Sequence, residues 1–587
     1  MIMNGLKGIL DKVQKPGRYI GEETNSVRKA FTKSRTSVVL AYPDTYEVGM
    51  SYLGLRILYH LLNERDDIVC ERVFMPWDDM ERELKNHGRR LFSLESKTDI
   101  NRFDIVGFSL SYELTYTNVL NMLHLGGITL VSRQRRGDEP LVIAGGACCY
   151  NPEPMSGFID AFIIGDGEGS LPRFIDEYRR ARAKTRDRKR ILRSLAGLEG
   201  VYVPSLYKAE YSGKRFLRLR PVEKEVPAVV EKARVRDLEN TYYPVKQIVP
   251  LVKIIHDRMA VEVMRGCPNR CRFCQAGAVN RPVRVRTVDR LRSICRETYR
   301  YTGYERISLL SLSSVNYPYL VDLVRALKED FRDRGIGISI PSLRVDETFY
   351  SLPEMISAVR RTGLTFAPES ASDRMRESLG KDIDIRVLCR SALLAFRHGW
   401  ARLKLYFMVG FPGEPEDEAE NIIKLSRELS GLKKTVSSGA AEIKVSVNPF
   451  IPKAHTPFQW LGMKEKSGMN RIKKALLSNS SRKIQVAFHN LEQSLVEGSL
   501  SRGERRLSNV IYTAWNRGAK MDSWTEFFNF RIWEESFREN GLDIHDYAYR
   551  TYALDDALPW AHIRTGIDEN YFKTEIEKSG LYRPPDR

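Results

Sequence analysis

Three cysteines stand close together near the middle of the chain, within residues Val261–Gly277. Cys267, Cys271 and Cys274 are separated by three and then two residues and follow a run of apolar residues that predicts a strand. Thiolates are soft ligands that suit zinc and iron–sulfur centres. The residues between the cysteines are polar, which disfavours a set of inert core thiols. The loop therefore predicts a metal centre.

The number of cysteines separates the two kinds of centre. A structural zinc site is closed by four ligands, usually in two paired half-sites, whereas this loop has three cysteines in eight residues and no histidine nearby. Three cysteines can hold a 4Fe–4S cube by three of its irons and leave the fourth iron open. The alternative is a zinc site completed by Cys295, which lies in a stretch typical of a helix interior. The remaining cysteines are expected to be small buried hydrophobic residues: Cys70, Cys148, Cys149 and Cys389.

Strand and helix patterns alternate on both sides of the cysteines, over residues 251–460. The strand candidates are 260–264, 307–312, 338–341, 365–368, 403–410 and 443–448. Strands that alternate with helices indicate a parallel sheet. Six such units predict a partial (βα)6 barrel, short of the eight units of a complete one.

The cysteine spacing, with the aromatic Phe273 just before the last cysteine and the first barrel strand before the loop, resembles that of the radical SAM superfamily. The resemblance implies that S-adenosylmethionine (SAM) chelates the open iron through its amino and carboxylate groups. One-electron reduction then cleaves SAM to a 5′-deoxyadenosyl radical, which abstracts hydrogen from the substrate. In such enzymes the cofactor performs the difficult chemistry and the protein positions it. A reductant such as flavodoxin or ferredoxin is an implied partner.

Three later segments are similar to the SAM-binding elements of that family, each at the end of a predicted strand. A carboxylate can only accept hydrogen bonds, which suits ribose hydroxyls or the amino group, and glycine lets the backbone approach adenine closely. The implied residues are Ser313 and Ser314 after the second strand, Glu369 after the fourth, and Lys404, Gly410 and Pro412 on and after the fifth.

Residues 36–200 also alternate short apolar strands with helices. The strand candidates are 37–42, 72–75, 104–110, 141–145 and 161–165. Continuous apolar strands favour a doubly wound, Rossmann-like or flavodoxin-like sheet with helices on both faces. Ligands of such sheets bind beyond the carboxyl ends of the strands.

The turns after these strands resemble those of cobalamin-binding domains, whose fingerprint is Asp-x-His-x-x-Gly, then Ser-x-Leu, then Gly-Gly. The corresponding residues are Asp44, Tyr46 and Gly49, then Ser109, then Gly145 and Gly146. Tyr46 stands where the cobalt-ligating histidine would be. Two outcomes are open: cobalamin binds without a protein ligand, or the fold persists without the cofactor.

The whole chain resembles an uncharacterised family of radical SAM proteins with an N-terminal cobalamin-binding-like domain. If cobalamin binds, that resemblance implies methyl transfer to an unactivated carbon. Without it, another radical modification is implied. The expected division has an N-terminal segment (1–35), the doubly wound domain (36–200), a hairpin and linker (201–250), the barrel (251–460) and a mainly helical extension with its own small core (461–587).

Composition limits the partners. The chain has 587 residues, 42% of them hydrophobic, and no apolar run near the ~18 residues of a membrane span, so we expect a cytoplasmic protein without a membrane partner. The formal charge of +19 favours polyanions such as RNA, although surface solubility explains it equally well. A dense basic stretch at residues 179–193 has the same two interpretations. Two further hypotheses are a zinc-stabilised, non-catalytic RNA-binding protein and a radical SAM fold that has lost turnover.

Overall fold

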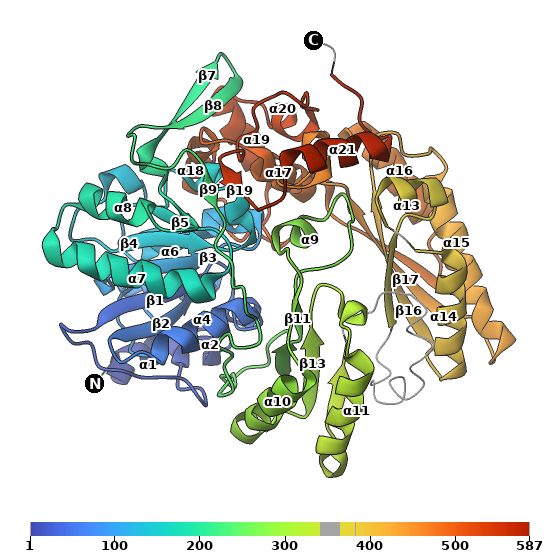
Figure 1. Ribbon diagram of the computed structural model, residues 1–587, viewed down its shortest axis with the longest axis horizontal. Coiled ribbons are helices and arrows are strands. Elements are labelled where there is room, and N and C mark those ends of the chain that lie inside the picture. Colours follow the sequence, from blue (N-terminus) through green and yellow to red (C-terminus); the bar gives the residue numbers. More distant parts are fainter. Residues whose placement is uncertain (1, 341–363, 382, 586–587) are drawn as a thin grey trace.

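The computed structural model describes residues 2–340, 364–381 and 383–585 (Figure 1). Its N-terminal half contains one sheet of six strands in the order β2-β1-β3-β4-β5-β6. The strands are β1 (Thr36–Tyr42), β2 (Ile68–Phe74), β3 (Ile105–Ser109), β4 (Leu141–Gly145), β5 (Ala161–Ile163) and β6 (Val201–Tyr202). All neighbours are parallel except β5 and β6. This order is the flavodoxin-like doubly wound arrangement, as the sequence predicts.

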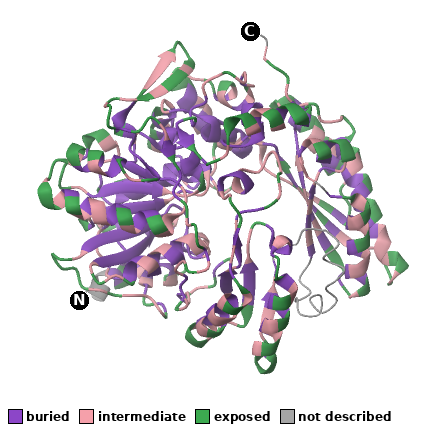
Figure 2. Cartoon of the chain, in the orientation of Figure 1, coloured by how far each residue is buried: buried purple, intermediate pink, exposed green. Residues whose placement is uncertain are grey.

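Helices cover both faces of this sheet, so every position of β1 and β2 is buried (Figure 2). The covering helices are α4 (Leu53–Asn63), α5 (Asp78–Asn86), α6 (Tyr116–Leu125), α7 (Gly167–Lys184) and α8 (Arg188–Ala196). The shorter helices α1 (Ile2–Leu10), α2 (Gly17–Ile20) and α3 (Tyr46–Gly49) complete this half. Burial on both faces explains why the strands are continuously apolar rather than alternating.

The basic stretch at residues 179–193 lies on α7 and α8, and several of its arginines pair with nearby carboxylates. Arg188 bonds to Asp160 at 2.6 Å, and Arg193 bonds to Glu223 at 2.6 Å. These ion pairs use arginines of the stretch to close the domain, which agrees with the interpretation as an ordinary solvated helix face.

An antiparallel hairpin follows, formed by β7 (Tyr207–Ser212) and β8 (Arg215–Pro221). The sequence predicts this hairpin from its alternating pattern around a glycine turn. The linker after it contributes β9 (Val230–Glu231), which pairs in parallel with β19 (Ile563–Arg564) near the end of the chain. The linker is therefore hydrogen-bonded to the C-terminal region through this strand pair.

In the second half, the described residues form seven parallel strands in two sheets that follow chain order. The first sheet has β10 (Met259–Glu262), β13 (Arg306–Leu310) and β14 (Gly337–Ser339), and the second has β15 (Leu364–Glu369), β16 (Arg402–Val409), β17 (Glu442–Pro449) and β18 (Ile484–Phe488). Their helices are α10 (Val288–Thr302), α11 (Leu320–Asp330), α13 (Asp373–Ser378), α14 (Ile385–Arg397), α15 (Glu418–Leu432) and α16 (Lys466–Ser478). The six expected strands are present, although Pro341 at the end of the third lies outside the described residues.

Strand β18 differs from the expectation, because it pairs with β17 beyond the expected barrel end at residue 460. Its residues Ile484–Phe488 are mostly apolar, but the strand is short, lies in a segment expected to be helical, and buries only Ile484 fully. The second sheet therefore continues into the segment that reads as a helical extension.

The C-terminal extension is mainly helical, as expected, but it has no separate core. Its helices are α17 (Leu491–Arg502), α18 (Leu507–Asn516), α19 (Phe530–Glu539), α20 (Ile544–Tyr549) and α21 (Glu569–Ser579). Trp533 and Leu500 belong to the same apolar core as the N-terminal sheet, whereas Trp560 and Phe572 pack with Phe450 at the end of the barrel. Within the described ranges, no helix has the length and apolar character needed to cross a membrane.

Candidate functional site

The cysteine loop begins where β10 ends. The short strand β11 (Met264–Arg265) pairs with β12 (Arg284–Val285), so the two ends of the loop are tied together at its base. Gly266 precedes the first cysteine with φ +90°, and a Cβ there would lie 2.8 Å from the Asn280 carbonyl oxygen. Glycine is required at this close crossing. Helix α9 (Gln275–Val279) follows the last cysteine.

Two of the three sulfurs have N–H partners within the loop. The Gly277 N–H donates to the Cys274 Sγ at 3.3 Å, and the Asn269 side-chain amide donates to the Cys267 Sγ at 3.4 Å. Burial raises the pKa of the Cys274 thiol, and the Gly277 N–H and the charge of Lys381 act against that rise. Hydrogen bonds to sulfur are a common feature of iron–sulfur sites. This donor set fits a cluster held by cysteine thiolates.

The end of β13 lies against the loop through the same asparagine. The Asn269 amide approaches the Asn316 Oδ1 at 3.2 Å and the Ser313 Oγ at 3.5 Å, and the Ser313 hydroxyl donates to Asn316 at 2.6 Å. Both serines are buried, and the Ser314 hydroxyl donates away from the loop, to the Leu309 carbonyl at 3.3 Å. Ser313 therefore fits direct contact with a cofactor at the loop, and Ser314 supports the turn from inside.

The end of β15 also reaches the loop. Glu369 has φ +68°, a left-handed conformation that is strained for residues other than glycine. Its carboxylate pairs with Lys381 at 3.1 Å, and burial raises its pKa while Lys381 opposes the rise. The loop is joined to the same region because the Arg272 N–H donates to the Leu379 carbonyl at 2.9 Å. The expected carboxylate thus lies beside the cysteines.

The end of β16 contains a carboxylate that the sequence analysis did not single out. The Gly410 N–H donates to both oxygens of Glu414, at 3.0 and 2.8 Å, and burial raises the pKa of Glu414 to about 7. Lys404 lies over the Tyr406 ring and bonds to its hydroxyl, and Pro412 is half-buried. Glu414 belongs to the same Gly-Phe-Pro-Gly-Glu segment as Gly410 and Pro412, and this position in the sequence could have identified it as a site residue.

Three of the residues expected to contact cobalamin meet at the carboxyl edge of the N-terminal sheet. Ser109 pairs with Gly145 in the ladder between β3 and β4, and both are half-buried. Gly146 follows with φ +114°, and a Cβ there would lie 2.5 Å from the Leu110 carbonyl oxygen. These glycines allow two strand ends to approach each other closely.

The other three expected residues make contacts within the protein, and their role in binding cobalamin stays a prediction. The Tyr46 hydroxyl donates to Glu23 at 2.9 Å, and burial raises its pKa. Asp44 accepts hydrogen bonds from the Trp524 indole at 3.0 Å and from a serine of the C-terminal extension. A Cβ at Gly49 would lie 2.3 Å from the Phe74 ring. With its hydroxyl bonded to Glu23, Tyr46 does not fit a cobalt ligand, as its residue type already indicates.

Cys295 does not join the loop. It is fully buried on α10 among Leu291, Ile294 and Ile307, and burial raises its pKa to about 12. Across the described residues, no three histidine, cysteine or acidic side chains converge on the position of a single ion. Cys295 therefore does not complete a four-cysteine zinc site with the loop.

A buried charged group joins the N-terminal sheet to the loop after β17. Lys453 bonds to Glu113 at 2.8 Å and to Glu497 at 2.9 Å. The neighbouring Ala454 carbonyl accepts a hydrogen bond from Gln275, just after the last cysteine of the loop. These residues lie far apart in the sequence, so no local pattern could identify them as a group.

Comparison with known families decides the identity of the chain. The model described as "Radical SAM superfamily" matches residues 261–426, and the one described as "Radical SAM proteins, N-terminal" matches residues 54–204. Together the two matches span more than half of the chain. The chain belongs to the radical SAM superfamily. The first match contains the cysteine loop and the ends of β13, β15 and β16.

Two curated relatives of this radical SAM protein match it in sequence. An uncharacterised protein of Methanocaldococcus jannaschii is 28% identical over 478 residues, which are 81% of this chain and 90% of the relative. An uncharacterised methyltransferase of Pyrococcus horikoshii is 27% identical over 280 residues, which are 46% of this chain and 53% of that protein.

Solved structures with related architecture were also found. The radical SAM methyltransferase TsrM of Kitasatospora setae, solved with cobalamin and a [4Fe-4S] cluster, has a TM-score of 0.49 and 12% identity, covering 86% of this chain and 99% of TsrM. The cobalamin-dependent SAM radical enzyme OxsB, solved with aqua-cobalamin and SAM, has a TM-score of 0.45 and 12% identity, covering 93% of this chain and 79% of OxsB.

Proposed function

We propose that this chain is a radical SAM enzyme that binds a 4Fe–4S cluster through Cys267, Cys271 and Cys274 and binds SAM beside it. The supporting observation is that Ser313 and Glu369, from the ends of two barrel strands, lie against the three-cysteine loop. A carboxylate and a hydroxyl at that position suit the polar groups of SAM. Parallel barrels place their reactive groups at this end of the strands.

The chain's own residues would hold and shield these groups. The bound cluster and SAM together supply one-electron chemistry and the radical that removes a hydrogen atom from the substrate. The N–H groups of Asn269 and Gly277 would orient two thiolates and stabilise their charge. Phe273 packs against the apolar group that includes Met375 and Leu379, which fixes the loop and excludes water. The Lys381 ammonium would hold the Glu369 carboxylate in place.

For the reaction class we propose methyl transfer. The supporting observation is the relative from Pyrococcus horikoshii, which is named a methyltransferase. An external one-electron donor, such as a flavodoxin or ferredoxin, would reduce the cluster. A corrin at the edge formed by Ser109, Gly145 and Gly146 would have no ligand from Tyr46, whose hydroxyl is bonded to Glu23.

Anaerobic reconstitution with iron and sulfide tests the proposal. The wild-type chain should absorb near ~400 nm and cleave SAM when reduced, whereas Cys271→Ala should lose both properties. Cys389→Ala is the matched control, because this half-buried thiol lies on α14 beside Glu428, and it should behave as wild type. A Cys271→Ala protein that retains both properties, or wild type that takes up zinc and no iron, would overturn the assignment.

A further inference from the structure

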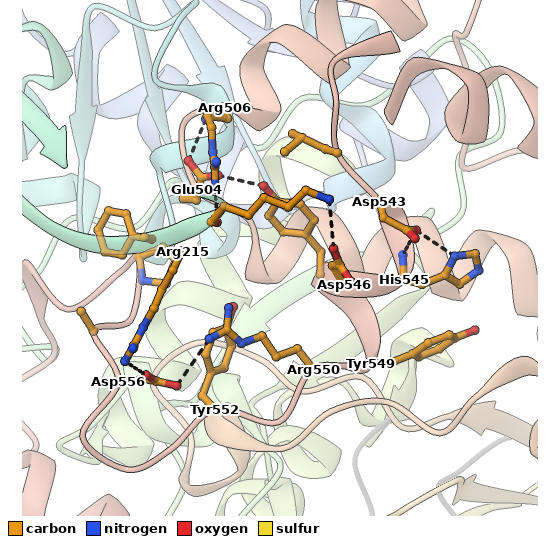
Figure 3. A pocket seen from close by; sticks show the side chains of 16 residues that line it. Arg215, Glu504, Arg506, Asp543, His545, Asp546, Tyr549, Arg550, Tyr552 and Asp556 are labelled. Atoms are coloured by element: carbon orange, nitrogen blue, oxygen red, sulfur yellow. Dashed lines mark hydrogen bonds and ion pairs between the residues drawn. The ribbon is translucent and has the colours of Figure 1, made fainter. Parts of the chain in front are cut away.

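A cavity lies between the β7–β8 hairpin and the C-terminal extension (Figure 3). Its volume is about 540 Å³, within the range of roughly 300–1,000 Å³ that small-molecule sites occupy. The walls come from three segments: the hairpin turn at 214–216, residues 504 and 506, and residues 542–559. None of the three cysteines and none of the strand-end residues described above lines it. The cavity is therefore separate from the cluster site.

Three carboxylates around this cavity already have partners. Glu504 accepts hydrogen bonds from two tyrosine hydroxyls and from a neighbouring guanidinium. Asp556 accepts one from a backbone N–H at 2.9 Å and pairs with Arg215. Asp543 accepts from both the backbone N–H and the ring of His545, each at 2.9 Å. Most of the acceptor capacity of these groups is used inside the protein.

Several donors, by contrast, are unused. The Arg550 guanidinium lies against the Tyr552 ring and approaches Asp556 only to 3.7 Å (Figure 3). Within the described part of the chain it donates no hydrogen bond, and its side chain is 40% exposed. Lys214 has one distant partner, Asp546 at 3.9 Å, whose side chain is 63% exposed and well solvated. Among the described residues the Tyr552 hydroxyl has no hydrogen-bond partner either. The cavity thus has two cationic side chains whose ion pairs are long, so they have hydrogen-bonding capacity left for a ligand.

The unused donors define the chemistry of a ligand. A guanidinium matches the geometry of phosphate oxygens, and lysine supplies a point charge. Phe216, Tyr549 and Tyr552 add aromatic surface to the same walls, and aromatic rings stack on nucleobases with little sequence preference. The net charge of +19 attracts phosphate-bearing partners.

We propose that this cavity binds a nucleotide, with the phosphate on Arg550 and Lys214 and the base against the tyrosine rings. The nucleotide is either a free mononucleotide or one nucleotide of an RNA strand, because both present the same phosphate and base. The proposal goes beyond the radical SAM function and does not depend on it. Nucleotide binding is measured without SAM cleavage, so the two proposals can fail separately.

Fluorescence anisotropy on the full-length chain at low salt, with fluorescein-labelled AMP and a short fluorescein-labelled single-stranded RNA, tests the site. Arg550→Gln removes the charge and keeps a polar side chain, so binding should weaken about tenfold. The slope of log affinity against log salt concentration should fall by about 1, the amount expected for one lost phosphate contact. Arg531→Gln is the matched control, since Arg531 is 83% exposed on α19 and lies outside the cavity.

The two probes distinguish the sources of the nucleotide. Loss of AMP binding in Arg550→Gln, with wild-type behaviour in the control, supports a mononucleotide site, and loss of RNA binding alone supports a nucleotide within a strand. The proposal is overturned if wild type binds neither probe, or if Arg550→Gln binds both as well as the control does.

Discussion

Glu369 and Lys381 form an ion pair at 3.1 Å at the edge of the cysteine loop, and Glu369 holds it from a left-handed backbone conformation. A strained residue persists only where the surrounding structure fixes it, and such positions cluster at functional sites. The charges of both side chains act on the pKa of the Cys274 thiol: Lys381 lowers it and Glu369 raises it. The pair thus links a strand end of the barrel to the proposed cluster.

Glu369→Gln should weaken SAM binding about tenfold, because the neutral amide accepts hydrogen bonds from ribose or amino groups less strongly than a carboxylate does. Isothermal titration of SAM into anaerobically reconstituted protein measures this. The control is Glu377→Gln, an exposed carboxylate on α13, which should bind SAM as wild type does. Equal affinities for the two variants would remove Glu369 from the SAM site.

Arg72 should be a large contributor to stability. Its side chain is 0% exposed and bonds to Glu23 at 2.8 Å and to Glu95 at 2.7 Å. Arg72→Met leaves two buried carboxylates without their cation and should cost about 3–5 kcal/mol. Arg28→Met removes an exposed pair with Glu22 and should cost less than about 1 kcal/mol. Denaturant unfolding followed by circular dichroism compares them, and similar losses would refute the buried network.

Gly146 is a second position with a strong structural requirement. Gly146→Ala places a Cβ 2.5 Å from the Leu110 carbonyl, whereas Gly213→Ala in the hairpin turn places one in open space. Both glycines have positive φ, which costs another residue about 1 kcal/mol or more, and Gly146, at φ +114° and ψ −176°, lies in a region that essentially only glycine adopts. Gly146→Ala should lose at least about 1 kcal/mol more in the free energy of unfolding. Equal losses would mean that the two strand ends can separate without cost.

Asp522 predicts a pH dependence of stability. Burial raises its pKa to about 6 from 3.8. A carboxyl with a raised folded-state pKa favours folding while protonated, so its contribution is complete below about pH 3.8 and is lost as the pH rises through about 6. Over that window wild type should lose about 2–3 kcal/mol relative to Asp522→Asn.

Unfolding midpoints measured across the acidic range show whether stability falls as the pH rises, as expected for Asp522. Asp417→Asn, at an exposed aspartate preceding α15, makes the same chemical change and should leave the pH profile as in wild type. A profile of Asp522→Asn that parallels wild type would show that the buried carboxyl does not titrate in this range.

Much of the fold is readable from the sequence because its strands are local apolar runs with turn residues between them. The spacing of Cys267, Cys271 and Cys274 likewise identifies the loop, since all three lie within eight consecutive residues. The edge strand β18 is missed although its residues are mostly apolar, because so short an apolar run is equally compatible with a helix.

The hydrogen-bond partners of the expected site residues could not be predicted from local sequence patterns. Tyr46 turns to Glu23 and Asp44 turns to Trp524, and these partners come from segments before the sheet and near the C-terminus. The Arg550 cavity likewise joins the hairpin turn to distant segments. Such contacts depend on how far-apart segments pack, which local patterns do not contain.

The most direct test of the central claim is the electron paramagnetic resonance spectrum of the reduced, anaerobically reconstituted chain with and without SAM. We predict the signal of a reduced 4Fe–4S cluster that changes when SAM is added, because in the proposed site SAM would coordinate the iron that no cysteine holds. A cluster signal that SAM leaves unchanged, or no iron–sulfur signal at all, would contradict the account.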